Sequence, residues 1–585
     1  MPLARSTLPE LLDRAVAAHG GRDAISFDGE AITYTELGAR VARGTTWLAG
    51  AGVRANEVVG LLAGNTPAQP LALFALLGAG AVVAQLSPLD PPRAMARKLA
   101  DVGARRLVTT DAFRAVAEAL AAEGAIDRVV VIGPGGAMHD QVLIAPSKGA
   151  ACTAQTPAAT GPEADPALTV APVPIVAARD MTACAAAGNA ASACPAGGDS
   201  PGNVPRPTPG TLTGSTVAIA AVAPASLPRD VDDVAILQFT GGTTGVAKAA
   251  MLTHGNLTAA VSAYDLFNAA PHRRVHPGDR VMAVLPLFHI YALTAVLLRT
   301  LHAGATLLLR PRFDPATALD DIEAGCTHFY GVPTMWIAIV NHPGAAQRDW
   351  SRLRIASSGG ASLPPEISQR MHAMTGLTLG GGWGMTETAP AGTNLLPDCP
   401  HAPGLIGVPL PGVDVQVVAL DDSRRVLPPG QAGELRIRGP NVMPGYWNRP
   451  ADNATAFVDG WFLTGDIGTM APDGQFTLVD RKKEMLISGG FNVYPRVIED
   501  AIHEHPDVHE AAVIGVPDPY RGQAAKAFVS LRAGAAPLTL AALRAFLAPR
   551  LGRHELPAQL EVRDALPHTA VGKLAKLQLH EGHAP

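Results

Sequence analysis

Two rhythms of apolar and polar residues alternate along the first part of the chain. Residues 35–48 have the spacing of an amphipathic helix, whereas residues 57–62 and 106–109 are short apolar runs typical of buried strands. The apolar run 71–84 is interrupted by glycine and is too short to span a bilayer, so it predicts a buried helix followed by a strand. Short strands that alternate with helices predict a parallel sheet covered by helices.

Short apolar runs continue through the middle of the chain and predict a second parallel layer. Thr253 has a side chain suited to an N-cap, so we expect a helix to begin near His254. The runs that we interpret as strands of this layer are residues 281–285, 306–309, 327–330 and 353–356, and the apolar run 234–239 before them predicts a buried strand.

Past residue 400 the strands shorten and turns multiply. Asp473-Gly474 is a hairpin signal between two such strands, which indicates a small subdomain resembling a β-barrel. We therefore predict an α/β fold in which residues 1–480 form a large domain of doubly wound sheets plus this subdomain.

The last part of the chain predicts a compact α+β unit, residues 481–585, which we expect to be a small mobile lid domain. A proline stands at the first position of its first helix, where the missing N–H costs nothing. The predicted elements are a helix at 495–505, strands at 511–515 and 526–531, and a helix at 538–551.

Residues 133–228 differ from the rest because Ala, Pro, Gly, Ser and Thr dominate and no period emerges. We interpret this stretch as a mobile insertion with a strand near 168–176. Three of the five cysteines lie in it, and we assign them no role.

The 585 residues carry a net charge of −5, which leaves no basic face for nucleic acid. The odd number of cysteines, without metal-type spacing, favours a reduced cytoplasm. The first residues lack the core of a signal peptide, and no segment is apolar enough to span a membrane, although peripheral membrane contact stays open. The oligomeric state is not determined.

A loop rich in glycine and threonine follows the apolar run 234–239. Glycines let backbone N–H groups approach an anion, threonine hydroxyls add neutral donors, and a lysine supplies a full charge. The spacing excludes a P-loop, and the alternative is a plain turn between a strand and a helix. The expected phosphate-binding residues are Thr240, Gly241, Gly242, Thr243, Thr244, Gly245 and Lys248.

A second glycine-rich stretch, residues 380–388, leads into Trp383 and Thr386-Glu387. Gly381 and Gly382 would let Trp383 lie against an aromatic base while Thr386 and Glu387 face phosphates and Mg²⁺. A single carboxylate together with nucleotide oxygens is an ordinary magnesium site, so Glu387 is the expected metal ligand. The alternative is a buried tryptophan followed by a capping Thr-Glu pair.

Together, Thr-Gly-Gly-Thr-Thr-Gly-Val-Ala-Lys and Gly-Trp-Gly-Met-Thr-Glu resemble motifs of the adenylate-forming superfamily, closest to its fatty-acyl-CoA synthetase branch. The resemblance implies that Asp466 and Arg481 bind the ribose of ATP and that Lys483 is the hinge between two domains. It implies that Lys573 is catalytic, with Glu387, Thr386 and Lys248. Supporting stretches place His289 and Tyr291 at the acyl pocket and Ala361 beside the adenine.

The same resemblance implies two half-reactions that use ATP, Mg²⁺ and coenzyme A. A carboxylate attacks the α-phosphorus of ATP to give an acyl-adenylate, and the thiol of coenzyme A then attacks its carbonyl. Between the two steps the small domain would swing about Lys483, withdrawing Lys573 and presenting Gly489 and Gly490, which leave room for the pantetheine arm.

The substrate is expected to be a medium- or long-chain fatty acid, with an aromatic or dicarboxylic acid as the alternative. Leu293 stands where some long-chain members place a gating tryptophan, and Gly241, Ala247 and Ala249 also depart from the usual loop. His289 cannot bind a substrate ammonium as an aspartate does in amino-acid members, and we expect no appended carrier domain, because the sequence runs only twelve residues past Lys573. A carrier-dependent adenylation unit, a luciferase-type oxygenase and a non-catalytic acyl or nucleotide-binding protein are the rival interpretations.

Overall fold

The structure is a computed structural model that describes residues 4–133, 138–142, 229–240, 247–270, 272–361, 363–397, 399, 402–488, 491–568 and 574–580. Most of the predicted insertion, with the strand at 168–176, lies outside these residues, as do Cys152, Cys184 and Cys194. The first residues of the predicted insertion form strand β7 (Met138–Val142), which pairs antiparallel with β6 (Arg128–Ile132). Regular sheet structure therefore continues past residue 133.

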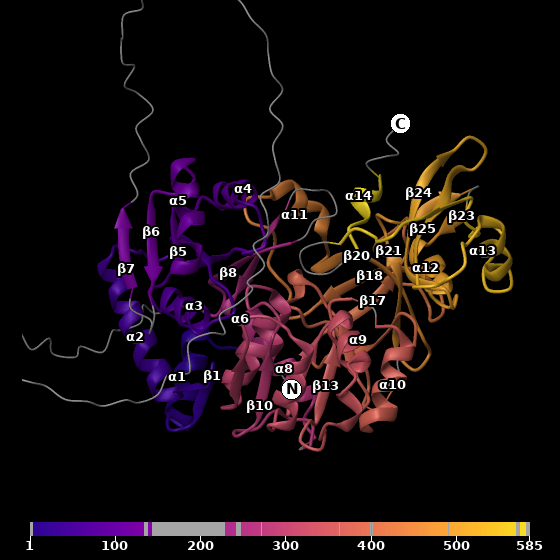
Figure 1. The fold of residues 1–585 in the computed structure, drawn as a ribbon. Helices are drawn as coiled ribbons and strands as arrows, with labels where there is room; N and C mark the ends of the chain where they lie inside the picture. The colour runs from indigo at the N-terminus through magenta and orange to yellow at the C-terminus, as the bar shows by residue number, and fades with distance from the viewer. Residues whose placement is uncertain are drawn as a thin grey trace, which may run out of the picture. The chain divides into compact units, whose positions relative to one another are not determined.

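A seven-stranded sheet forms the first layer, in the order β7-β6-β5-β3-β4-β8-β9 (Figure 1). Its five central strands are parallel, as the alternating pattern predicted, and its two edge strands are antiparallel. The remaining strands are β3 (Val58–Leu62), β4 (Val82–Gln85), β5 (Arg106–Thr110), β8 (Val234–Phe239) and β9 (Ala249–Thr253). Helices α4 (Pro92–Val102) and α5 (Arg114–Ala122) contribute to the apolar core on one face of it.

A fourteen-stranded sheet forms the second layer. Its parallel part confirms the predicted second layer and comprises β1 (Asp23–Phe27), β10 (Arg280–Ala283), β11 (Thr306–Leu309), β12 (His328–Gly331), β13 (Ile355–Ser358) and β14 (Gly380–Trp383), with β2 (Glu30–Thr33) antiparallel at the edge. The predicted barrel-like subdomain is an antiparallel continuation of this sheet. It comprises β15 (Thr393–Asn394), β16 (Leu405–Pro409), β17 (Asp414–Val418), β18 (Gly433–Arg438), β19 (Phe457–Val458), β20 (Trp461–Met470) and β21 (Phe476–Arg481).

The main hydrophobic core joins side chains of both sheets to several helices. These are α1 (Leu8–His19), α2 (Tyr34–Gly50), α3 (Ala68–Gly78), α6 (His254–Phe267) and the π-helix η3 (Ala292–Leu298), which continues into α7 (Arg299–His302). A second core packs the other face of the parallel strands against α8 (Pro315–Glu323), α9 (Pro333–Asn341) and α10 (Pro365–Thr375). Within the described residues, no helix combines the length and apolar character needed to cross a bilayer.

The C-terminal residues form the expected mixture of helices and strands around a core of their own. They comprise β22 (Leu486–Ser488), β23 (Phe491–Val493), α12 (Pro495–His503), β24 (Val508–Asp518), β25 (Gly522–Leu531), α13 (Leu540–Leu547), β26 (Gln559–Val562) and α14 (Lys576–His580). Helix α13 is shorter than the predicted 538–551, because Thr539 caps its start and the chain turns after Leu547, where Arg550 N bonds the Leu547 carbonyl.

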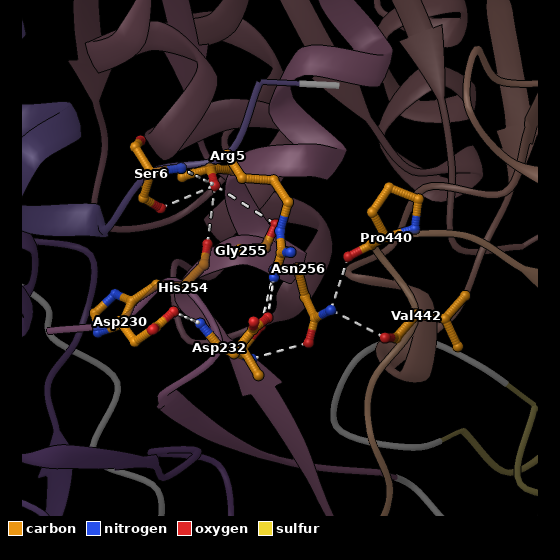
Figure 2. Close-up of polar contacts among 11 residues, drawn as sticks. Arg5, Ser6, Asp230, Asp232, His254, Gly255, Asn256, Pro440 and Val442 are labelled. Atoms are coloured by element: carbon orange, nitrogen blue, oxygen red, sulfur yellow. Dashed lines mark hydrogen bonds and ion pairs between the residues drawn. The ribbon is translucent and has the colours of Figure 1, made fainter. Parts of the chain in front are cut away.

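Thr253 caps α6, as predicted, in a reciprocal capping box with Asn256: each backbone N–H donates to the other side chain at 3.0 Å. The Asn256 amide also donates to the carbonyls of Pro440 and Val442 at 2.8 and 2.9 Å (Figure 2). The cap therefore fixes the segment that precedes Met443, which contacts the site described below.

Candidate active site

The glycine-threonine loop joins β8 to the antiparallel strand β9, and helix α6 follows only after β9. The loop therefore connects two antiparallel strands, and not a strand and a helix as expected. Its neck is closed by a 2.9 Å hydrogen bond from Thr240 N to the Lys248 carbonyl. The other predicted phosphate-binding residues, Gly241, Gly242, Thr243, Thr244 and Gly245, lie outside the described residues.

The Lys248 ammonium at this neck pairs with Asp452, on helix α11 (Pro450–Ala456). It also lies 5.1 Å from the centroid of the Tyr446 ring. Tyr446 is held here because the neighbouring residues Gly445 and Trp447 exchange backbone hydrogen bonds with β9. The lysine is thus preoriented by one carboxylate and one aromatic face.

Glu387 contacts the hydroxyl group of Tyr446. The tyrosine hydroxyl donates to Glu387 Oε1 at 2.8 Å, and Met443 N donates to the Glu387 carbonyl at 2.8 Å. Burial raises the pKa of the Glu387 carboxyl, while the Tyr446 hydroxyl and the charge of Arg481 oppose this rise. Glu387 and Thr386 belong to one 3-10 turn, η5 (Thr386–Thr388), so the predicted phosphate and metal residues share a short rigid element.

Trp383 ends strand β14 and is 8% exposed, so it forms a wall of the site rather than a free-standing platform. Its indole Nε1 donates to Asp466 Oδ2 at 2.8 Å. Gly382 in the same strand cannot be replaced, because a Cβ there would lie 2.3 Å from the Thr393 carbonyl oxygen. Gly381 pairs with Ser358 of β13 and continues the sheet up to this wall.

Asp466 and Arg481 are register partners in the β20–β21 hairpin, and Arg481 Nε lies 3.4 Å from Asp466 Oδ1. Asp466 is 4% exposed; burial raises the pKa of its carboxyl, and Arg481 and the Trp383 bond oppose the shift. Lys483 follows two residues after the end of β21 and is exposed.

The predicted acyl-site residues lie where η3 meets the ends of β12 and β13. His289 Nδ1 accepts a hydrogen bond of 3.3 Å from Tyr291 N, and the Tyr291 and Ser357 hydroxyls share another. A Cβ at Gly359 would lie 2.9 Å from the Tyr291 ring, so this approach requires glycine. Ala361, predicted to lie near the adenine, is exposed at the end of this loop.

The structure therefore brings together the loop neck, the Trp383–Glu387 turn and the Asp466–Arg481 pair. The predicted catalytic Lys573 and the glycines Gly489 and Gly490 lie outside the described residues. Among the residues that are described, no three acidic, histidine or cysteine side chains cluster as a metal site.

Sequence reasoning missed Tyr446 and Asp452, which connect Lys248 to Glu387. A signal for Tyr446 was available in the sequence, since Gly445-Tyr446-Trp447 resembles a further signature of the adenylate-forming superfamily. No comparable signal marked Asp452, because a lone acid at the start of a helix is ordinary helix chemistry.

Comparisons with known proteins show which family the chain resembles along its length. The family model described as "AMP-binding enzyme" matches residues 12–447, and "AMP-binding enzyme C-terminal domain" matches residues 497–573. The chain is 32% identical to a long-chain-fatty-acid–CoA ligase of Escherichia coli O6:H1, over 98% of this chain and 94% of that protein. It is 35% identical to a feruloyl-CoA synthase of Amycolatopsis sp, over 94% of each.

A further match, 40% identical to a Bacillus subtilis long-chain-fatty-acid–CoA ligase, covers 60% of this chain and 62% of that protein. Among solved structures, ATP-bound MatB from Rhodopseudomonas palustris superposes with a TM-score of 0.78 at 26% identity, over 99% of both chains.

Proposed function

The chain belongs to the AMP-binding enzyme family, within the adenylate-forming superfamily, and from that premise we propose that it is an AMP-forming acid–thiol ligase. It would convert a carboxylic acid, ATP and coenzyme A into acyl-CoA, AMP and diphosphate. The observation that supports this best is the position of Tyr446, which contacts both Glu387 and Lys248. One aromatic side chain thereby links the expected metal ligand to the expected phosphate ligand.

The residues suit a nucleotide. The Asp466 carboxylate is buried, yet it receives one indole N–H and a distant guanidinium, so it retains acceptor capacity for the two hydroxyls of a ribose. Glu387 would be the single protein ligand of a magnesium ion whose other ligands are phosphate and water oxygens, an arrangement that Mg²⁺ commonly adopts. Bound magnesium would neutralise phosphate charge.

The chain's own residues would then act by position and charge. Lys248 and the loop that begins at Thr240 would hold the phosphates, and Trp383 with Gly381 and Gly382 would form the wall against the base. Preorganised donors of this kind contribute on the order of 3 kcal/mol each. We also propose that Lys573 completes the charge for adenylation and that the lid, residues 481–585, turns about Lys483 before thioester formation, where Gly489 and Gly490 admit the pantetheine arm.

The relatives' names include both fatty and aromatic acids, so the substrate is proposed here only as a small organic carboxylic acid. We place the reaction in the cytoplasm, where ATP and coenzyme A are available.

Pyrophosphate release tests the proposal. Purified protein with ATP, Mg²⁺ and a panel of short, long, dicarboxylic and aromatic acids should release pyrophosphate with at least one acid and form a thioester when coenzyme A is added. Glu387→Gln should reduce the rate about a hundredfold. Nucleotide binding without pyrophosphate release from any acid would identify a non-catalytic binding protein, and light emission would identify an oxygenase.

A further inference from the structure

The segment that leads into the expected acyl site is held by side chains that belong to the other sheet. Residues 285–288 follow β10 of the fourteen-stranded sheet and precede His289. Asn65 lies in the loop after β3 of the seven-stranded sheet and is 6% exposed. Its Nδ2 donates to the Leu285 carbonyl at 2.8 Å, and its Oδ1 accepts from Leu287 N at 2.9 Å. One side-chain amide therefore binds two peptide groups of this segment.

A second amide reaches the same segment from strand β8. Gln238 Nε2 donates to the Phe288 carbonyl at 2.9 Å, and the Gln238 residue is 6% exposed. Gln238 stands two residues before Thr240, where the expected phosphate loop begins. A single hydrogen bond thus joins the strand that leads into the phosphate loop to the segment that leads into His289.

The expected acyl-site residues follow the path of this segment. His289 N donates to the Pro286 carbonyl at 2.9 Å, which closes a turn. His289 Nδ1 accepts from Tyr291 N at 3.3 Å, and Leu293 N donates to the His289 carbonyl at 2.9 Å. These bonds connect the turn to the π-helix that follows, so a shift of residues 285–288 would move His289 and Tyr291 together.

The neighbourhood of Gln238 indicates that its amide is not retained for stability. Gln85 is its register partner in the parallel pair β4–β8, so both side chains leave the same face, which packs into the main core through Val83 and Ile236. Gln238 Oε1 and both amide atoms of Gln85 are buried without a hydrogen-bond partner among the described residues. Such atoms cost folding free energy, so apolar side chains would be more stable here. The bond to Phe288 distinguishes Gln238 from Gln85.

We propose that Asn65 and Gln238 are positioning residues of the acyl site. Through the peptide groups of residues 285–288, they hold the acid-binding segment at a fixed distance from the phosphate loop, so that the substrate carboxylate meets the α-phosphorus of ATP. Reaction between two bound partners depends on such close contact, and a misplacement of about 1 Å costs on the order of a hundredfold in rate. This inference rests on the proposed ligase function and adds two positioning residues to its site.

The test compares two buried glutamines that are neighbours in the sheet. Gln238→Met keeps the length of the side chain and removes the donor to Phe288. We expect kcat for pyrophosphate release, with the best acid of the panel, to fall about tenfold or more, while KM for ATP and KM for the acid each change less than about threefold. Gln85→Met is the matched control, because its amide has no partner to lose among the described residues. Its kcat should equal that of the wild type.

Gln238→Glu supplies a second measurement that a purely structural role would not move. The protonated carboxyl of this isosteric variant can donate to the Phe288 carbonyl, whereas the ionised carboxylate cannot. The ratio of its kcat to that of the wild type should therefore rise as pH falls from 8 to 5. Asn65→Asp should behave in the same way, since it keeps the acceptor for Leu287 N and loses the donor to the Leu285 carbonyl.

The outcomes separate this inference from the ligase function. Equal kcat values for Gln238→Met and Gln85→Met, or a raised KM for the acid with unchanged kcat, would overturn the inference and leave the ligase function standing. A kcat ratio of Gln238→Glu that does not depend on pH would overturn it as well, and this ratio decides if Gln238→Met does not fold. Absence of pyrophosphate from every acid with the wild-type protein would overturn both.

Discussion

Trp383 Nε1 and Asp466 Oδ2 lie 2.8 Å apart although 83 residues separate them in the chain. The hydrogen bond joins the end of a parallel strand to an antiparallel hairpin, and both of its side chains are buried. It fixes the carboxylate that would receive the ribose and the indole that would form the wall against the base, so the two parts of a nucleotide would be positioned by one contact.

Trp383→Phe keeps an aromatic ring but removes the indole donor from the buried Asp466. A hydrogen bond to a charged group contributes about 1.5–3 kcal/mol, so we expect KM for ATP to rise on the order of tenfold or more. Initial rates of pyrophosphate release at varied ATP concentration measure this effect. Trp350→Phe is the control, because Trp350 Nε1 donates at 2.9 Å to the Ala345 carbonyl. An equal change in both variants would show a general loss of packing.

Tyr446→Phe removes the hydroxyl that opposes the raised pKa of Glu387. The pKa of Glu387 should then rise further, so the acidic limb of the pH–rate profile should move to higher pH in the variant. The measurement is kcat/KM for ATP between pH 5 and pH 8. Tyr34→Phe serves as the control, since the Tyr34 hydroxyl donates to the Ala305 carbonyl at 2.7 Å. A limb that stays in place would mean that Glu387 does not titrate in catalysis.

Lys248→Met should lower kcat/KM for ATP about a hundredfold, because a fixed positive charge at the phosphates is lost. Asp452→Asn should have a much smaller effect, since it removes only the partner that orients the ammonium. Lys98→Met is a close control: Lys98 also pairs with an aspartate, Asp90, at 2.7 Å and lies 5.2 Å from an aromatic ring, that of Phe239. Similar losses for the two lysines would argue against a phosphate role for Lys248.

Asp480 makes the stability of the protein depend on pH. Burial raises the pKa of its carboxyl to about 6 from 3.8. The folded state binds this proton more tightly than the unfolded state does. The resulting contribution to the free energy of unfolding is complete below pH 3.8 and is lost as pH rises through 6, a change of about 3 kcal/mol. Asp480→Asn should lose less stability than the wild type between pH 4 and pH 7.

Thermal unfolding at both pH values measures this difference. The control is Asp518→Asn, in an exposed turn where two backbone N–H groups hold the pKa of the carboxyl low. In the wild type the stabilising contribution of the Asp518 carboxylate is lost only as pH falls below 3.8, so Asp518→Asn should show the same change between pH 4 and pH 7 as the wild type. Parallel curves for the wild type and Asp480→Asn would contradict the assignment.

The fold was largely predictable from local pattern. The apolar runs at β3, β5, β8 and β11 lie within a residue of their predicted bounds, because strand burial and glycine punctuation act over a few residues. Helix α13 was predicted too long, since the apolar spacing continues where the backbone turns away.

The sequence by itself determined the layered architecture, the family and the residues of the motifs. Tertiary structure alone decided that Tyr446 would join Glu387 to Lys248 and that Asp452 would hold the lysine. The physical reason is the range of the interactions: strand and helix signals are local, whereas these contacts depend on how two sheets pack and on the register between strands far apart in the chain.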